Sequence, residues 1–135
     1  MTYTVASFET HVAGNAATFL GFSPDGRYTA VFEDDGESGY FYSIDRSRGA
    51  ATIQDALHIY DARVFAADRS HLELKIAWST DGCAAALFID GEAHAVFDFD
   101  ARRGYCRSGQ PHPPAGARWS PSGHDWNGTA LKAFA

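Results

Sequence analysis

Residues 72–99 read LELKIAWSTDGCAAALFIDGEAHAVFDF, and this stretch decides the fold. Apolar and polar residues alternate from Leu72 to Trp78, which predicts a half-buried β-strand. The dipeptide Asp90-Gly91 then separates two apolar runs, and this pattern predicts a β-hairpin with a two-residue turn. Residues 84–89 are apolar throughout, so we expect this hairpin to lie centrally in a sheet that is covered on both faces.

A weaker copy of the same pattern comes earlier in the chain. Residues 22–49 and 78–104 share the order of a Ser-x-Asp-Gly turn, an apolar run, an acidic turn and an aromatic run. A duplicated supersecondary unit explains this order. The alternative is that any two hairpins share Asp-Gly turns and aromatic strands. The identical pairs are Ser23/Ser79, Asp25/Asp81, Gly26/Gly82, Ala30/Ala86, Phe32/Phe88, Asp34/Asp90, Gly36/Gly91, Glu37/Glu92 and Asp45/Asp100.

The length of each turn predicts which side chains share a face of the sheet. The first unit has one extra turn residue, in Asp34-Asp35-Gly36, so we expect a three-residue loop there. Side chains alternate along a strand, and the loop length therefore sets the faces. The sets expected to share a face are Tyr28, Ala30, Phe32, Tyr40, Tyr42 and Ile44 in the first unit, and Ala84, Ala86, Phe88, Ala95, Phe97 and Phe99 in the second. The expected core is Phe32, Tyr42, Trp78, Leu87, Phe88, Val96, Phe97 and Phe99.

The remaining segments surround these two units. Residues 17–22 are expected to form a strand, and so are residues 56–60, for which one helical turn is the alternative. Residues 62–68 are ambiguous, and four prolines make residues 110–121 irregular. Residues 124–134 are expected to form a short helix, with Asp125 as its cap. Residues 1–135 are therefore predicted to be a single, mostly β domain, with antiparallel sheets built from two related β-hairpin units, flanking strands and a short C-terminal helix.

Composition limits the partners and the compartment. The 135 residues include 17 acidic and 11 basic side chains, and the net charge of −6 argues against binding to nucleic acid. No apolar run approaches the roughly 20 residues of a membrane-spanning helix, and the N-terminal segment lacks the features of a secretory signal. The two cysteines, Cys83 and Cys106, are expected to be reduced thiols, although one bridge stays open as an alternative. We therefore expect a cytoplasmic protein.

Five segments of the sequence form a further pattern: residues 33–42, 55–60, 94–99, 104–107 and 124–126. Together they resemble a family of small uncharacterised bacterial proteins, a domain of unknown function. The resemblance covers about residues 20–130 and implies a bacterial origin. It implies no activity, so no catalytic residue is carried over from it.

The sequence contains no recognisable catalytic or metal-binding motif. Gly-rich phosphate loops and Gly-x-Ser-x-Gly elbows are absent. The histidines and cysteines do not pair at the close spacing of structural zinc sites, so no metal or cofactor is expected. The candidates considered are His58, His94, His112, His124, Cys83 and Cys106. Catalytic residues stay unknown, and an enzyme of unrecognised type is one alternative for the function.

The leading expectation is a protein-binding or inhibitor module, for example an immunity protein that blocks a toxin. Carboxylates recur at the second turn of both units, and a negative patch attracts a basic protein. The expected contact residues are Asp34, Asp35, Glu37, Asp90 and Glu92. The alternative is a small-molecule-binding domain with its site between the two hairpin units. That pocket would be lined by Tyr40, Tyr42, Trp78 and His94.

Overall fold

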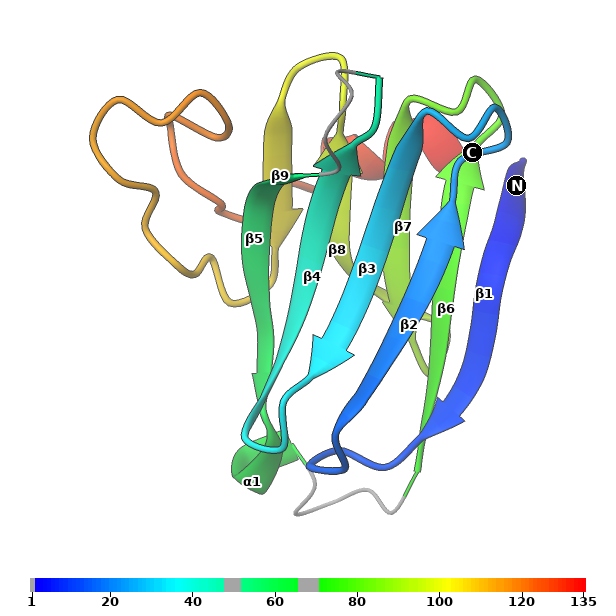
Figure 1. Ribbon diagram of the computed structural model, residues 1–135, viewed down its shortest axis with the longest axis vertical. Coiled ribbons are helices and arrows are strands. Elements are labelled where there is room, and N and C mark those ends of the chain that lie inside the picture. The colour runs from blue at the N-terminus through cyan, green and yellow to red at the C-terminus, as the bar shows by residue number, and fades with distance from the viewer. Residues whose placement is uncertain (1, 48–51, 66–70) are drawn as a thin grey trace.

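The computed structural model describes residues 2–47, 52–65 and 71–135, and these contain two antiparallel sheets that pack face to face (Figure 1). The five-stranded sheet runs in the order β1 (Tyr3–His11), β6 (Leu72–Ser79), β7 (Ala84–Ile89), β8 (Glu92–Asp98) and β9 (Arg103–Cys106). The four-stranded sheet runs in the order β2 (Ala17–Phe22), β3 (Tyr28–Asp34), β4 (Ser38–Asp45) and β5 (Thr52–Asp61). The short helices are α1 (Ala62–Phe65) and the 3-10 helix η2 (Gly128–Phe134).

The predicted mostly β architecture is confirmed, including both hairpins and the strands over residues 17–22, 56–60 and 72–78. Strands β1 and β9 were not anticipated from the sequence. The C-terminal helix is present, but its cap differs from the expectation. The Asn127 side chain accepts a hydrogen bond from the Thr129 amide at 3.0 Å, whereas Asp125 forms a parallel bridge with Cys106. The expected Asp125 cap was therefore wrong.

The Ser-x-Asp-Gly turn has the same hydrogen bonds in both units. Ser23 Oγ donates to Asp25 at 2.8 Å and accepts from the Tyr28 amide at 3.0 Å. Ser79 Oγ donates to Asp81 at 2.6 Å and accepts from the Ala84 amide at 3.0 Å. Each serine hydroxyl thus joins the turn to the first residue of the strand that follows. The similarity between the units is therefore structural at this turn, and superposition of the complete hairpins stays a prediction.

In the first hairpin, the pairing of β3 with β4 is shifted from the predicted register. Asp34 pairs with Gly39 and Phe32 pairs with Phe41, so the turn spans Asp35 to Ser38. The Asp35 carboxylate accepts hydrogen bonds from the Glu37 and Ser38 amides, and these bonds hold the tighter turn. The expected three-residue loop was wrong. Tyr40, Tyr42 and Ile44 consequently lie on the outer face of the sheet, opposite Tyr28, Ala30 and Phe32.

The second hairpin has its predicted two-residue turn, with positive φ angles of 51° at Asp90 and 82° at Gly91. Its faces differ from the prediction because His94 is an extra residue in β8. Phe88 pairs with Ala93, but Leu87 pairs with Ala95, so the register shifts at this point. A bulge of this kind reverses which side chains share a face. The inner face consists of Ala85, Leu87, Ile89, Ala95, Phe97 and Phe99, and the outer face has Ala84, Ala86, Phe88, Ala93 and Val96.

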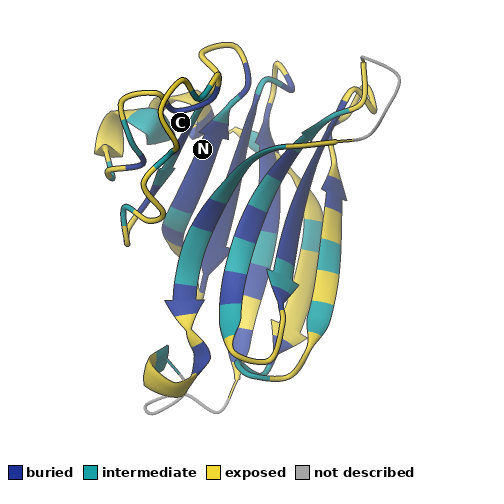
Figure 2. Cartoon of the chain, turned by 60° about the vertical axis from the view of Figure 1, so that its left-hand side comes forward, coloured by how far each residue is buried: buried dark blue, intermediate teal, exposed yellow. Residues whose placement is uncertain are grey.

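The main core lies between the two sheets, and a smaller one lies on the far side of the five-stranded sheet. Figure 2 shows buried segments along the strands of both sheets and exposed loops. In the smaller core, Phe134 of η2 packs near Phe88 and Val96. Every residue of β7 is buried, as expected for a strand covered on both faces. The expected core residues are all buried except Tyr42, which is half-buried on the outer face of β4.

Replacing Phe97 tests the main core. Its side chain is fully buried and stacks on Phe41 of the opposite sheet, with ring centroids 5.1 Å apart. We expect Phe97→Ala to lower the free energy of unfolding by about 3–5 kcal/mol, because the contacts are lost and a cavity remains. The control is Phe22→Ala, whose side chain is 48% exposed, with an expected loss below about 1 kcal/mol. Equal losses in urea denaturation would contradict this assignment.

Candidate functional site

The two acidic turns lie at the same end of the sandwich, and the β3–β4 turn lies next to α1 (Figure 1). Further carboxylates gather there: Asp61 ends β5, and the Glu73 amide donates to Asp90 Oδ1 at 2.8 Å. All these side chains belong to exposed residues. We name this surface the acidic end, and it consists of Asp35, Glu37, Asp61, Glu73, Asp90 and Glu92.

Asp34 does not belong to the acidic end, although it was expected to contact a partner. It is 1% exposed, because its side chain points between the sheets. Its carboxylate accepts from Tyr60 Oη at 2.6 Å, and from the Gly14 and Gly36 amides at 2.8 Å each. His11 Nε2 lies 2.9 Å away. Asp34 therefore joins the β1–β2 connection to β5, and burial excludes it from a contact surface.

These partners also determine the charge of Asp34. Burial alone would raise the pKa of the carboxyl group, since a charge is costly away from water. The hydrogen bonds from Tyr60, His11 and the two amides outweigh burial, and the pKa is lowered. Burial raises the pKa of Tyr60, and so does the hydrogen bond that its hydroxyl donates to Asp34. The group is therefore a carboxylate held by donors, in a structural position.

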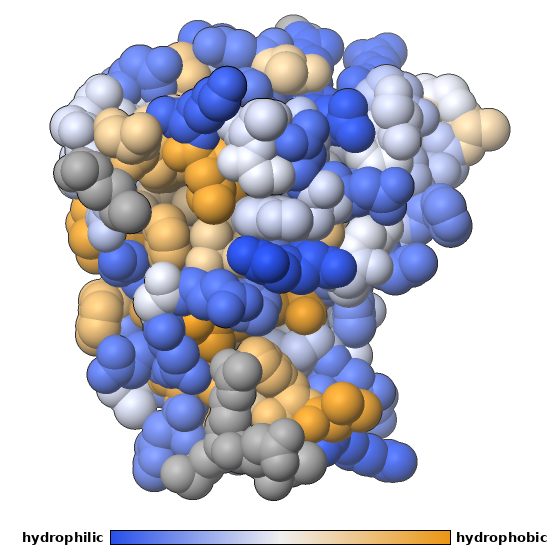
Figure 3. All heavy atoms as spheres, turned by 180° about the vertical axis from the view of Figure 1, so that it is seen from behind, coloured by the Kyte–Doolittle hydropathy of each residue, from blue (hydrophilic) through white to orange (hydrophobic). Residues whose placement is uncertain are grey.

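A groove beside the acidic end is partly apolar. It has a volume of about 430 Å³ and runs between the end of β5, α1 and β8. We name it the anchor groove and define it by His58, Ile59, Val64, Phe65, His94 and Arg107. Val64 is 74% exposed. Figure 3 shows hydrophobic surface at this end of the molecule, with hydrophilic atoms around it.

The anchor groove is continuous with the acidic end. Glu92 approaches His94 to 3.8 Å and Arg107 to 3.9 Å on one side. On the other side, Glu37 and Asp61 line a smaller hollow together with Arg63 of α1. Val64 and Phe65 were not predicted as site residues, because the sequence pattern of residues 62–68 is ambiguous. Only the described part of that segment, residues 62–65, is placed.

The pocket expected between the two units is not formed. Trp78 is fully buried in the main core, where its indole Nε1 donates to the Gly21 carbonyl at 3.3 Å. Tyr40 and Tyr42 stack on the outer face of the four-stranded sheet, with ring centroids 6.0 Å apart. His94 lies on the bulge of β8 and lines the anchor groove. The tighter first turn and the bulge separate these side chains onto different surfaces.

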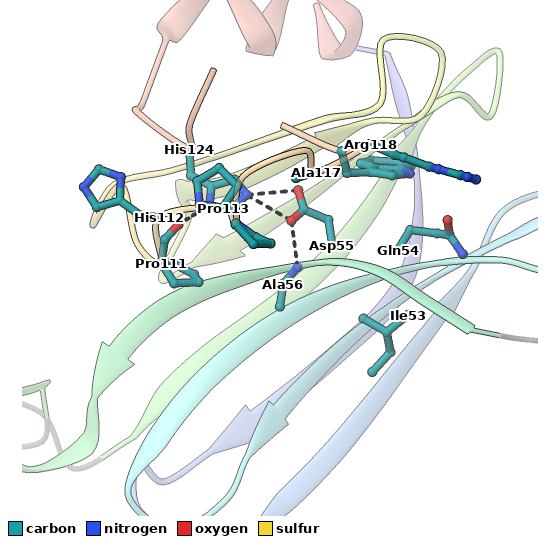
Figure 4. Close-up of a pocket in the computed structure, with 12 residues that line it drawn as sticks. Ile53, Gln54, Asp55, Ala56, Pro111, His112, Pro113, Ala117, Arg118 and His124 are labelled. Carbon is teal, nitrogen blue, oxygen red and sulfur yellow. Dashed lines mark hydrogen bonds and ion pairs between the residues drawn. The ribbon is translucent and has the colours of Figure 1, made fainter. Parts of the chain in front are cut away.

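A second cavity of about 450 Å³ lies between β5 and the irregular segment that follows β9 (Figure 4). Its walls are mostly apolar and include Ile53, Pro111, Pro113 and Trp119. At its floor, Asp55 of β5 meets His124, whose Nε2 lies 3.0 Å from both carboxylate oxygens. These two residues are 69 positions apart, so spacing along the chain could not reveal the pair.

Other chemistry in the described residues is limited. No group of three or more His, Cys, Asp or Glu side chains among them is arranged to hold a metal ion. Cys83 and Cys106 are unbridged, and burial raises the pKa of both thiols. None of the helices in residues 2–47, 52–65 and 71–135 has the length and apolar character needed to span a membrane.

Comparisons with known proteins identify relatives without a described activity. The family model DUF2251, described as an uncharacterized protein conserved in bacteria, matches residues 11–135. An uncharacterized protein of Haemophilus influenzae is 39% identical over 93 residues, which cover 69% of this chain and 58% of that protein. The chain thus spans less than two thirds of that relative's length. No solved structure matches.

Asp34 and Asp35 are adjacent in the chain, but the first is buried and the second is exposed, so replacing each in turn tests the structural role of Asp34. In Asp34→Asn, an amide nitrogen would face hydrogen-bond donors, and the charge that they stabilise would be lost. We expect the free energy of unfolding at pH 7 to fall by about 3–5 kcal/mol. In the control Asp35→Asn, the exposed side chain keeps an acceptor oxygen, and we expect a change of about 0.5 kcal/mol.

The effect of Asp34→Asn should also depend on pH. The folded-state pKa of Asp34 lies below its ordinary value of 3.8. The stability that Asp34 contributes is therefore present above that value and is lost as the pH falls through the folded-state pKa. The difference between wild type and Asp34→Asn should shrink in acid, as measured by chemical denaturation. A difference that is constant down to pH 2 would contradict this role.

Proposed function

The chain belongs to the DUF2251 family of proteins conserved in bacteria, and we propose that it is a protein-binding module whose acidic end receives a basic protein partner. A bacterial immunity protein that blocks a toxin is one form that such a module takes. The observation that carries the proposal is the position of the anchor groove, which adjoins the acidic end. The proposal therefore concerns one continuous surface with two kinds of contact.

The charge of this surface favours a basic partner. Asp35, Glu37, Asp90 and Glu92 are exposed and come from two turns that the fold brings to one end. Basic side chains near them in the described residues are Arg63 and Arg107. A patch with an excess of one charge accelerates association with the opposite charge, because it steers the encounter.

The anchor groove adds an apolar contact to the charged contacts of the acidic end. Protein interfaces commonly have an apolar centre with a polar rim, and a few anchoring side chains carry most of the binding energy. Val64 and Phe65 offer apolar surface, while Glu37, Asp61 and Glu92 lie around it. We therefore expect a basic segment that places one aliphatic or aromatic side chain in the groove.

The small-molecule alternative is favoured by a different feature, the cavity beside Asp55. Its volume of about 450 Å³ lies within the range of roughly 300–1,000 Å³ that ligand pockets span. The polar groups at its floor already bind one another, since Asp55 is paired with His124. A ligand there would make mainly apolar contacts. This alternative predicts that variants at the acidic end bind the ligand normally.

Two double variants with equal loss of charge test the proposal. A partner is first isolated from the native bacterium by affinity capture and identified by mass spectrometry. Glu37→Gln with Glu92→Gln then removes two charges from the acidic end. The control, Asp25→Asn with Asp100→Asn, removes two exposed charges from turns at the opposite end of the sandwich (Figure 1). We expect the first double variant to associate several-fold more slowly at low salt, and the control to associate at nearly the wild-type rate.

Salt and a groove variant extend this test. The deficit of the first double variant should shrink from about 10 mM to about 150 mM salt, since the Debye length falls from about 30 Å to about 8 Å. Val64→Asp should raise the dissociation rate and leave the free energy of unfolding nearly unchanged, because Val64 is exposed. Equal association rates for the two double variants would refute the acidic end as the binding surface.

A further inference from the structure

Both ring nitrogens of His124 face hydrogen-bond acceptors. Nδ1 lies 2.6 Å from the Pro111 carbonyl oxygen, and Nε2 lies 3.0 Å from each oxygen of Asp55. A neutral imidazole has one N–H and can satisfy one of these sides, whereas an imidazolium has two. The His124 side chain is 2% exposed, so water is poorly placed to supply the missing donor. The doubly protonated ring therefore satisfies both acceptors, and a neutral ring leaves one of them without a donor.

This pair holds a segment that has little other regular structure. Residues 110–124, which we name the latch loop, contain no helix or strand, and they cross the edge of β5. Ser120 Oγ donates to Asp55 at 2.7 Å and accepts from the Gly104 amide at 2.7 Å. Trp119 packs on Phe99, with ring centroids 5.4 Å apart. Asp55 is thus the residue of β5 on which both His124 and Ser120 converge.

We propose that His124 is a proton-dependent latch, which fastens the latch loop to Asp55 while its ring is charged and releases the loop when the ring loses a proton. On deprotonation, either the Pro111 carbonyl or the Asp55 carboxylate loses its donor, and the ion pair is lost. A buried acceptor without a donor is costly. The adjoining cavity of about 450 Å³ can admit water to the unpaired group, so loosening begins in this loop.

The surroundings of His124 determine the direction of its titration. Burial alone would lower the pKa of His124, but the hydrogen bond and the charge of Asp55, together with the Pro111 carbonyl, raise it above its ordinary value of 6.5. Arg103 of β9 opposes this shift. The other ionisable groups of the latch loop and its end are His112, Arg118 and Asp125.

The direction of the His124 pKa shift determines whether the latch opens as the pH falls or as it rises. The folded-state pKa lies above the unfolded-state pKa, so the latch contributes fully below the unfolded value. Its contribution is lost as the pH rises through the folded-state value. The latch is therefore closed below pH 6.5 and opens as the pH rises through the folded-state pKa, which lies above that value. The β-strands of the main core are held by apolar contacts and should stay closed while the latch loop opens.

Two measurements on the wild-type chain test the latch together. NMR of the histidine rings gives the pKa of His124, and amide hydrogen exchange corrected for its intrinsic pH dependence gives the opening of the latch loop. We expect exchange in residues 110–124 to increase with pH, by about tenfold for each unit by which the His124 pKa exceeds its unfolded value. Exchange in β7 should stay far slower than exchange in the latch loop at every pH, because β7 opens only when the domain unfolds.

Variants provide the controls. His112→Gln changes an exposed histidine of the same loop and should leave both the His124 titration and the exchange profile as in the wild type. Asp55→Asn removes the anion, so it should lower the His124 pKa and speed exchange in the loop already at neutral pH. A ring of His124 that is neutral at pH 6.5, or loop exchange that does not follow its titration, would overturn the proposal. The wild-type measurements decide this even if Asp55→Asn fails to fold.

Discussion

Strand β7 has apolar side chains on both of its faces, and the rest of the molecule is arranged to cover them. A strand of this kind needs a layer on each side, because either face left in water would cost the hydrophobic free energy of the fold. The four-stranded sheet covers the inner face through Phe41 and Leu57. Helix η2 covers the outer face through Phe134. The five-stranded sheet is therefore the middle of three layers, although only two of the layers are sheets.

Two buried carboxylates complete the packing where apolar contacts end. Asp34 ties the β1–β2 connection to β5 through His11, Gly14 and Tyr60. Asp55 ties the latch loop to the same strand through His124 and Ser120. Each carboxylate is surrounded by donors, which is the condition under which a buried charge is tolerated. Each carboxylate lies on a strand and binds a neighbouring segment that no sheet ladder holds, so polar bonds position that segment.

This division of the acidic residues bears on the proposed function. The acidic residues fall into two groups. Asp34 and Asp55 have side chains that are shielded from solvent and bind other parts of the chain. Asp35, Glu37, Asp90 and Glu92 stay exposed, and the antiparallel course of the strands brings them to one end. The anchor groove at that end provides apolar surface that a partner would cover. The proposed interface thus uses the carboxylates that stay exposed to solvent.

The sequence by itself determined seven of the strands, β2 to β8, and the places of the turns between the hairpin strands. The alternation from Leu72 to Trp78, the Asp90-Gly91 dipeptide and the Ser-x-Asp-Gly turns act over a few residues, and the structure contains each of them. Local hydrogen bonds and side-chain periodicity suffice for such features. The acidic turns could be predicted for the same reason, because their signals are local. The burial of Asp34 could not be predicted, because it depends on distant residues.

Only the tertiary structure decided the register, the faces and the buried pairs. The bulge at His94 moved Phe97 and Phe99 to the inner face with Leu87, and no turn signal marks a bulge inside a strand. Asp34 and Asp55 meet histidines that are 23 and 69 positions away, respectively. A carboxylate in a turn or strand has the same local sequence whether it is solvated or buried. Its role depends on which distant donors the packing of the two sheets brings within hydrogen-bond distance.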